Sequence, residues 1–209
     1  MSIELNESAL RSHFGSVCSI PALIEYRHQV EEGFELTAAE SLLQSAMGSA
    51  HRQLEYRIGR SALKAVLAAI RKNTDTSVIT WPSPFCSLSH SHGHAIAVAR
   101  IEGEGIGIDL QLIKTPAQAT ADRILSSETL RFWRGLPEAR QSRVLQRFWT
   151  VNEAVYKACP APQPAYFRHY RMEDAEAMDG KVTIEGTDLC FMAHTAELTD
   201  GFVSLAYRI

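Results

Sequence analysis

The sequence lacks the features that would place the protein in a membrane, on a secretory route or on nucleic acid. No apolar run approaches the roughly 18 residues of a membrane-spanning helix. The first residues show no basic region followed by an apolar stretch, so we expect no signal peptide. Basic residues are not in surplus, since 21 face 24 acidic residues, which argues against a general nucleic-acid coat. We therefore expect a cytoplasmic protein without membrane or nucleic-acid partners.

Cysteine is also scarce, with four residues and no pair in C-x-x-C spacing. A zinc finger or a thioredoxin-type site is therefore not supported, and reduced thiols are expected in the cytoplasm. The remaining composition is that of a folded chain, with 45% apolar and 22% charged residues. A length of 209 residues is enough to bury a sizeable core.

Helical and strand patterns alternate in blocks, which predicts an α+β fold. A capping box at Thr37 and Glu40 predicts a short helix ending near Gly48. Longer helical patterns cover about 51–72 and about 117–158, the second divided near Gly135 and Pro137. Asp200-Gly201 is typical of a hairpin turn. Strands are expected at 78–81, 86–88, 95–101, 105–112, 181–185, 189–195 and 202–207.

Charge is uneven along the chain. The segment from Thr120 to Lys157 holds seven basic and four acidic residues, whereas the rest of the chain is acidic. Such a segment is either an ordinary solvated helix face or a surface that attracts an acidic partner.

Two motifs place carboxylates beside other polar side chains. A strand through 105–112 would put Asp109 and Gln111 on one face, where their oxygens suit Mg²⁺ or simply face solvent. On the last predicted helix, Glu153 and Lys157 lie one turn apart. They form either a surface ion pair or a carboxylate for a metal or proton with an ammonium group for a phosphate.

Two further motifs carry imidazole and cationic groups. His90, His92 and His94 alternate, which on a strand would suit zinc, but Gly93 and the serines favour a turn. In that turn Ser89 and His90 would face a phosphate. On the long helix, Arg60 and Lys64 share a face and Arg52 precedes them, as a phosphate site or as solvated cations. Gly59 costs about 1 kcal/mol there relative to alanine, which suggests that another group approaches closely.

Taken in this order, the motifs resemble the 4′-phosphopantetheinyl transferase superfamily, and specifically its Sfp-type, two-lobed branch. The resemblance spans about residues 50 to 160. It implies two similar α/β lobes related by a pseudo-twofold axis, 1–112 and 113–209, packed as one monomeric unit with the active site between them. The matching stretches are Gly59-Arg60 with Lys64, Trp81-Pro82, Ser87 to Ser91, Gly107 to Gln111 and Trp149 to Lys157.

The resemblance implies transfer of 4′-phosphopantetheine from coenzyme A to a serine of an apo acyl or peptidyl carrier protein. This is the holo-[acyl-carrier-protein] synthase reaction, with Mg²⁺ as cofactor and adenosine 3′,5′-bisphosphate as the other product. Its implied catalytic residues are Asp109, Glu153 and Lys157, with Asp109, Gln111 and Glu153 toward the metal. Those implied for the nucleotide end of coenzyme A are Arg52, Arg60, Lys64, Ser89 and His90. The basic segment then becomes a candidate surface for the acidic carrier protein.

Two positions depart from the family pattern. Gln111 stands where the family has an acidic residue, so we expect weaker metal binding or a water in its place. Asn152 stands where the family has a lysine, which removes one cation. The alternatives are a catalytically silent homologue that binds carrier protein or coenzyme A without transfer, and an unrelated zinc hydrolase using the three alternating histidines.

Overall fold

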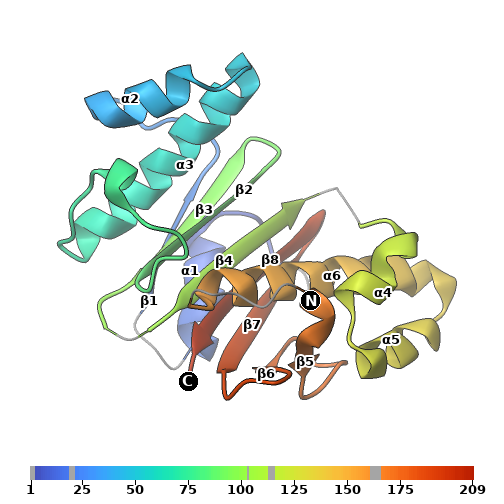
Figure 1. The fold of residues 1–209 in the computed structure, drawn as a ribbon. Helices are drawn as coiled ribbons and strands as arrows, with labels where there is room; N and C mark the ends of the chain where they lie inside the picture. The colour runs from blue at the N-terminus through green and yellow to red at the C-terminus, as the bar shows by residue number, and fades with distance from the viewer. Residues whose placement is uncertain (1–2, 19–21, 103, 113–115, 161–165) are drawn as a thin grey trace.

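The computed structural model describes residues 3–18, 22–102, 104–112, 116–160 and 166–209, which form a mixed α+β fold (Figure 1). The α-helices of these residues are α1 (Glu7–Val17), α2 (Ala38–Ser45), α3 (Ala50–Ala69), α4 (Ala121–Ile124), α5 (Ser127–Arg134) and α6 (Glu138–Ala158). Short 3-10 helices are η1 (Thr76–Val78), η2 (Gln118–Thr120) and η3 (Phe167–His169). The strands are β1 (Ala22–Arg27), β2 (Cys86–Ser91), β3 (His94–Arg100), β4 (Ile106–Leu112), β5 (Tyr170–Met172), β6 (Asp179–Ile184), β7 (Cys190–Leu198) and β8 (Gly201–Arg208).

The strands form two antiparallel sheets, so the predicted α+β class is confirmed. One sheet has the order β1-β3-β2 and the other the order β4-β8-β7-β6-β5. Strand β4, which the predicted boundary after residue 112 assigns to the first lobe, pairs along its whole length with β8. A division by sheets would therefore fall between β3 and β4, and the similarity of the two lobes stays a prediction.

Helices cover both faces of this arrangement. Helix α3 packs on the three-stranded sheet, and α6 lies across β4 and β8 of the five-stranded sheet. Helix α1 packs on the other face of the sheets, in contact with β1 and β7 (Figure 1). The apolar side of β4, with Ile106 and Ile108, shares one core with Leu10 and Phe14 of α1. That core also takes residues from β1 and β3, so the two sheets are held by a common hydrophobic interior.

The other side of β4 is shaped by glycine. A Cβ atom at Gly107 would stand 1.9 Å from the carbonyl oxygen of Ala154, and one at Gly105 would stand 2.2 Å from that of Ala158. Only hydrogen fits at these positions, so α6 can lie directly against the strand. Asp109, next on this side after Gly107, is thereby brought beside the last turns of α6.

The two sheets meet where β2 and β4 run side by side. Backbone N–H groups of Ile108, Leu110 and Leu112 donate to the Oγ atoms of Ser87, Ser89 and Ser91, each over 3.1 Å. We call these three serines the serine ladder. Because edge N–H groups need partners, the alternating serines join the sheets without backbone pairing.

Most predicted helices are confirmed. The capping box is present in both halves at the start of α2, where Thr37 Oγ1 accepts from the Glu40 N–H and the Glu40 carboxylate accepts from the Thr37 N–H. Ser126 caps α5, and α6 ends at Ala158. Each signal acts within one turn, which is why the sequence reveals it.

Two local predictions are wrong. Residues 78–81 are not a strand, because the side chains of Asp75 and Glu40 bind the backbone N–H groups of Ser77 and Thr76 and stabilise η1. The last hairpin turns at residues 199–200, one residue earlier than predicted, since Gly201 already pairs with Leu198. Glycine is needed at 201 because a Cβ there would meet the Gln111 carbonyl oxygen at 1.9 Å.

The N-terminal elements α1 and β1 were not predicted. Helix α1 has an ordinary start, with Asn6 Oδ1 accepting from the Ala9 N–H. Strand β1 pairs with β3, which lies far along the chain, with Ala22 opposite Arg100. In the described part of the chain, no helix combines the length and the apolar character needed to cross a membrane.

Candidate active site

Three charged side chains predicted to carry the chemistry lie together between β4 and α6. Lys157 Nζ donates to Asp109 Oδ1 at 2.7 Å and to the Ile108 carbonyl oxygen at 3.1 Å. Asp109 is 5% exposed and also accepts from the Ser89 hydroxyl at 2.9 Å. Glu153 projects from α6 one turn before Lys157. The close approach of α6 to Gly107 is what makes this cluster possible.

The electrostatics of the cluster favour a cation. Burial raises the pKa of Glu153, the Asp109 carboxylate raises it further, and Lys157 only partly offsets both. The Oδ2 atom of Asp109 is buried and has no hydrogen-bond partner among the described residues. A bare carboxylate oxygen beside a second, destabilised carboxylate fits the hard, oxygen-ligated ion Mg²⁺, which needs only one or two protein carboxylates.

A pocket of about 710 Å³ is lined by residues from both sheets; Asp109, Glu153 and Lys157 are not among its lining residues, but their neighbours on β4 and α6 are. Gln111, two residues after Asp109 on the same side of β4, lines it, as does Trp149, one helical turn before Glu153. Its far wall comes from α3 and β2, through Glu55 and His90. The remaining lining residues are Ser91, His92, Pro116, Ala117, Thr120, Arg123, Ile124, Tyr166 and Phe167.

A second, smaller pocket of about 370 Å³ collects three of the residues predicted for the nucleotide. Arg52, Arg60 and His90 line it, and Glu55 and His90 belong to both pockets, so the two adjoin. The Nε and Nη1 atoms of Arg60 are buried without a hydrogen-bond partner among the described residues, and its guanidinium lies 4.6 Å from the centre of the Tyr56 ring. Unpartnered guanidinium N–H groups in a pocket suit an anionic ligand.

Two other residues predicted for the nucleotide are held elsewhere. Lys64 Nζ bonds the buried Glu40 carboxylate at 2.7 Å and the Glu35 carbonyl oxygen at 3.1 Å. This links α3 to α2 and lies outside the pockets described. Ser89 is buried, with its hydroxyl shared between Asp109 and the Leu110 N–H. Their contact with coenzyme A stays a prediction.

The two departures from the family pattern differ in location. Asn152 is buried, and its Nδ2 donates to the Ile124 carbonyl oxygen at 2.8 Å, which fastens the end of α4 to α6. Gln111 lines the larger pocket, so its amide stands on the same side of β4 as Asp109. Gly59, in turn, allows β2 to approach α3, since a Cβ there would meet Leu88 Cδ2 at 3.3 Å.

The three alternating histidines do not act as a set. His92 and Gly93 form the two-residue loop between β2 and β3, with φ of 51° and 77°, as a type I′ turn requires. His94 Nδ1 is 2.6 Å from the Tyr26 hydroxyl. Among the described residues, no group of three or more histidine, cysteine or acidic side chains is arranged to hold a metal. The zinc hydrolase alternative therefore has no support in the geometry.

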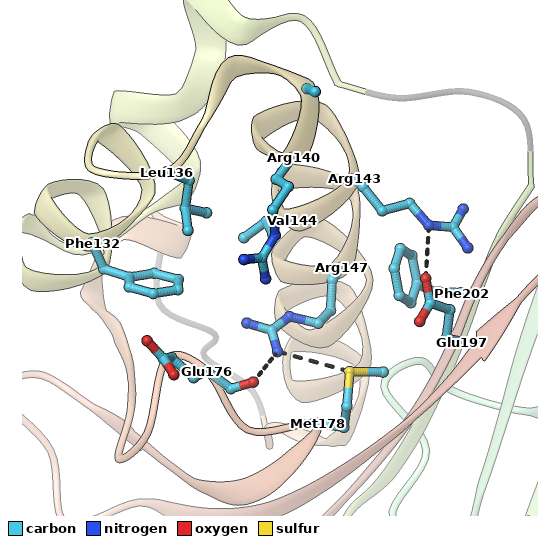
Figure 2. A pocket seen from close by; sticks show the side chains of 11 residues that line it. Phe132, Leu136, Arg140, Arg143, Val144, Arg147, Glu176, Met178, Glu197 and Phe202 are labelled. Carbon is cyan, nitrogen blue, oxygen red and sulfur yellow. Dashed lines mark hydrogen bonds and ion pairs between the residues drawn. The ribbon is translucent and has the colours of Figure 1, made fainter. Parts of the chain in front are cut away.

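A separate pocket of about 440 Å³ lies at the beginning of α6 and contains three arginines of the basic segment (Figure 2). Arg147 is buried and donates to the carbonyl oxygens of Glu176, Ala177 and Ala175. Arg143 pairs with Glu197 at 3.1 Å. Arg143 and Arg147 are therefore held by partners within the protein, so they contribute less to a docking surface than the count of basic residues suggests. The arginines of the segment that remain exposed are Arg123, Arg131, Arg134 and Arg140.

Some residues that line the two pockets were not predicted from the sequence as site residues. Glu55 and Tyr56 lie on the Arg52–Arg60 face of α3, and Tyr56 precedes Arg60 by one turn, a spacing that could have indicated them. Arg123, Tyr166 and Phe167 reach the larger pocket from segments distant in sequence. No local pattern marks such residues.

The arrangement is that of an α+β protein with a carboxylate–ammonium cluster and a separate pocket lined by Arg52 and Arg60, which suits group transfer from a phosphorylated substrate. Residues 105–206 match the family model of the 4′-phosphopantetheinyl transferase superfamily. The match begins at β4 and includes Asp109, Glu153 and Lys157, so it supports a transferase of this general type. Comparison with curated proteins gave no match.

Proposed function

We propose that the protein transfers the 4′-phosphopantetheine group of coenzyme A to a serine hydroxyl of an apo acyl or peptidyl carrier protein, as a member of the Sfp-type branch. The observation that carries the proposal is the cluster of Asp109, Glu153 and Lys157, with its bare Oδ2 atom, inside the segment that matches the superfamily. The smaller pocket also supports the proposal, because Arg52, Arg60 and His90 line it and would contact the phosphates and nucleotide of coenzyme A.

In this reaction the serine oxygen forms a bond to the β-phosphorus of coenzyme A. The bond between that phosphorus and the bridging oxygen breaks, and adenosine 3′,5′-bisphosphate leaves with the electron pair. Asp109 and Glu153 would hold Mg²⁺, which when bound supplies charge stabilisation for the pyrophosphate. Among the described residues, Lys157 Nζ donates to Asp109 and Ile108, which leaves the third of its N–H groups for a phosphate oxygen.

Glu153 is our candidate for receiving the serine proton, directly or through a water. Its raised pKa makes it a stronger base than an exposed glutamate. The pantetheine arm would lie against Trp149 and Phe167, whose rings pack edge to face at 5.6 Å in the wall of the larger pocket. Arg123 stands at the same wall, where an acidic carrier protein would approach.

The test is intact-protein mass spectrometry of several apo carrier proteins incubated with the protein, coenzyme A and Mg²⁺. We expect a mass gain of one phosphopantetheine group that EDTA prevents. Absence of a gain on every carrier, with coenzyme A still bound, would favour the silent homologue. That outcome would indicate that Gln111, where the family has an acidic residue, does not support transfer. A cytoplasmic, monomeric state and the two-lobe division at residue 112 remain predictions beside this proposal.

Replacement of Gln111 by glutamate is expected to lower the Mg²⁺ concentration for half-maximal transfer several-fold. The added carboxylate would stand on the Asp109 side of β4 and contribute charge that an amide lacks. A Mg²⁺ titration of transfer by both proteins measures the effect. An unchanged half-saturation point would show that position 111 does not contact the metal.

Replacement of His90 by alanine is expected to raise the KM for coenzyme A about tenfold or more, because His90 lines both pockets. Replacement of His92 provides the comparison, since it lies in the turn and lines only the larger pocket. We expect a much smaller change there. Equal losses in the two variants would contradict the assignment of His90 to the nucleotide.

A further inference from the structure

Within the serine ladder, one member has a contact that the others lack. Ser87 and Ser89 each accept a backbone N–H of β4 over 3.1 Å. Ser89 in addition donates its hydroxyl proton to Asp109 Oδ1 at 2.9 Å. Both Ser89 and Asp109 are 5% exposed, so this hydrogen bond is shielded from water.

The two oxygens of Asp109 are therefore treated differently. Oδ1 accepts from Ser89 on β2 and from Lys157 on α6, at 2.9 Å and 2.7 Å. Oδ2 is buried and has no partner among the described residues. Two donors, one on β2 and one on α6, hold Oδ1 in place, which leaves Oδ2 as the carboxylate oxygen available to a ligand.

We propose that Ser89 is a positioning residue that orients Asp109 so that Oδ2 faces a divalent cation. This inference rests on the proposed function, because it assumes that the cluster binds such an ion. It differs from the role expected from the sequence, in which Ser89 contacts the nucleotide. A serine hydroxyl has one proton, and here that proton is on Asp109, so Ser89 cannot donate to a phosphate at the same time.

The test compares Ser89→Ala with Ser87→Ala. Both variants lose one hydrogen bond between a serine of β2 and a backbone N–H of β4, so both should lose similar thermal stability. Only Ser89→Ala also loses the hydrogen bond to Asp109. The melting temperature is followed during Mg²⁺ titration without substrate. We expect half-saturation to rise about tenfold or more in Ser89→Ala, as for other residues that orient metal ligands, and to stay near wild type in Ser87→Ala. Ser89→Thr, which keeps the hydroxyl, should recover most of the loss.

Two results would overturn the positioning role. One is the same Mg²⁺ half-saturation in Ser89→Ala and Ser87→Ala. The other is weaker binding of coenzyme A by Ser89→Ala alone in EDTA, which would assign the hydroxyl to the substrate. Wild-type protein that binds Mg²⁺ but transfers nothing would contradict the proposed function and leave the positioning role intact. Wild-type protein that Mg²⁺ does not stabilise would overturn the positioning role.

Discussion

Replacement of Glu153 by glutamine is expected to reduce transfer about 100-fold or more and to raise the melting temperature of the metal-free protein. The loss of transfer follows because glutamine neither accepts the serine proton nor adds charge for a cation. The gain in stability follows because burial and Asp109 disfavour the ionised Glu153 carboxylate in the folded state. Removing that charge relieves the folded protein of an unfavourable interaction.

A carboxyl group with a raised pKa in the folded state destabilises the fold once the pH exceeds its unfolded value, about 4. The stability advantage of Glu153→Gln should therefore be absent toward pH 4 and grow as the pH rises through the raised pKa of Glu153. Thermal unfolding at several pH values, without and with Mg²⁺, measures it, and only wild type should gain stability from the ion.

The control for this experiment is Glu32→Gln, at an exposed position. It should change neither transfer nor the response to Mg²⁺. Near-normal turnover of Glu153→Gln would exclude Glu153 as the base. A melting temperature no higher than wild type at pH 8 would show that its carboxylate is well solvated or well paired.

Replacement of Gly107 by alanine is expected to destabilise the fold by about 3 kcal/mol, or roughly 6–12 °C in melting temperature for a chain of this length. The added Cβ would stand 1.9 Å from the Ala154 carbonyl oxygen and 2.7 Å from the Ala158 nitrogen. Both are backbone atoms of α6, so the helix itself must move. Because α6 carries Glu153 and Lys157, transfer should fall further than stability alone accounts for.

Gly180→Ala is the matched control, since this glycine also lies in a strand but a Cβ added there would meet no atom of the described residues within 4 Å. It should unfold near the wild-type temperature, because alanine also restricts the unfolded chain. Differential scanning fluorimetry and transfer assays on both variants decide the matter. Wild-type stability of Gly107→Ala would mean that α6 does not lie directly on β4.

Several elements could be predicted because their signals are local. The capping box of Thr37 and Glu40 acts within one turn, and the N-cap at Ser126 does the same. The turn signal at Asp200-Gly201, with apolar residues before and after it, predicts the hairpin of β7 and β8 to within one residue. The strand β1 could not be predicted with its partner, because its pairing with β3 depends on residues distant in sequence.

The residues of the candidate site could also be predicted only in part. Asp109, Glu153 and Lys157 could be nominated from residue type and spacing, because one strand and one helix place them. The same spacing on α3 indicates Arg60 and Lys64 together. Of the two, Arg60 lines one of the pockets described above, while Lys64 pairs with buried Glu40. The buried Glu40 carboxylate needs a cationic partner, and Lys64 provides it. No pattern within α3 indicates that Glu40 of α2 lies beside Lys64.

The sequence by itself determined the α+β class, most helices and the residue types available for phosphate and cation chemistry. Only the tertiary structure decided which of these side chains meet. Ser89 reaches Asp109 because β2 lies beside β4, and Lys157 reaches it because α6 rests on Gly107. Such contacts join segments distant along the chain. They depend on how the common core packs and on glycines that allow a helix to lie directly on a strand.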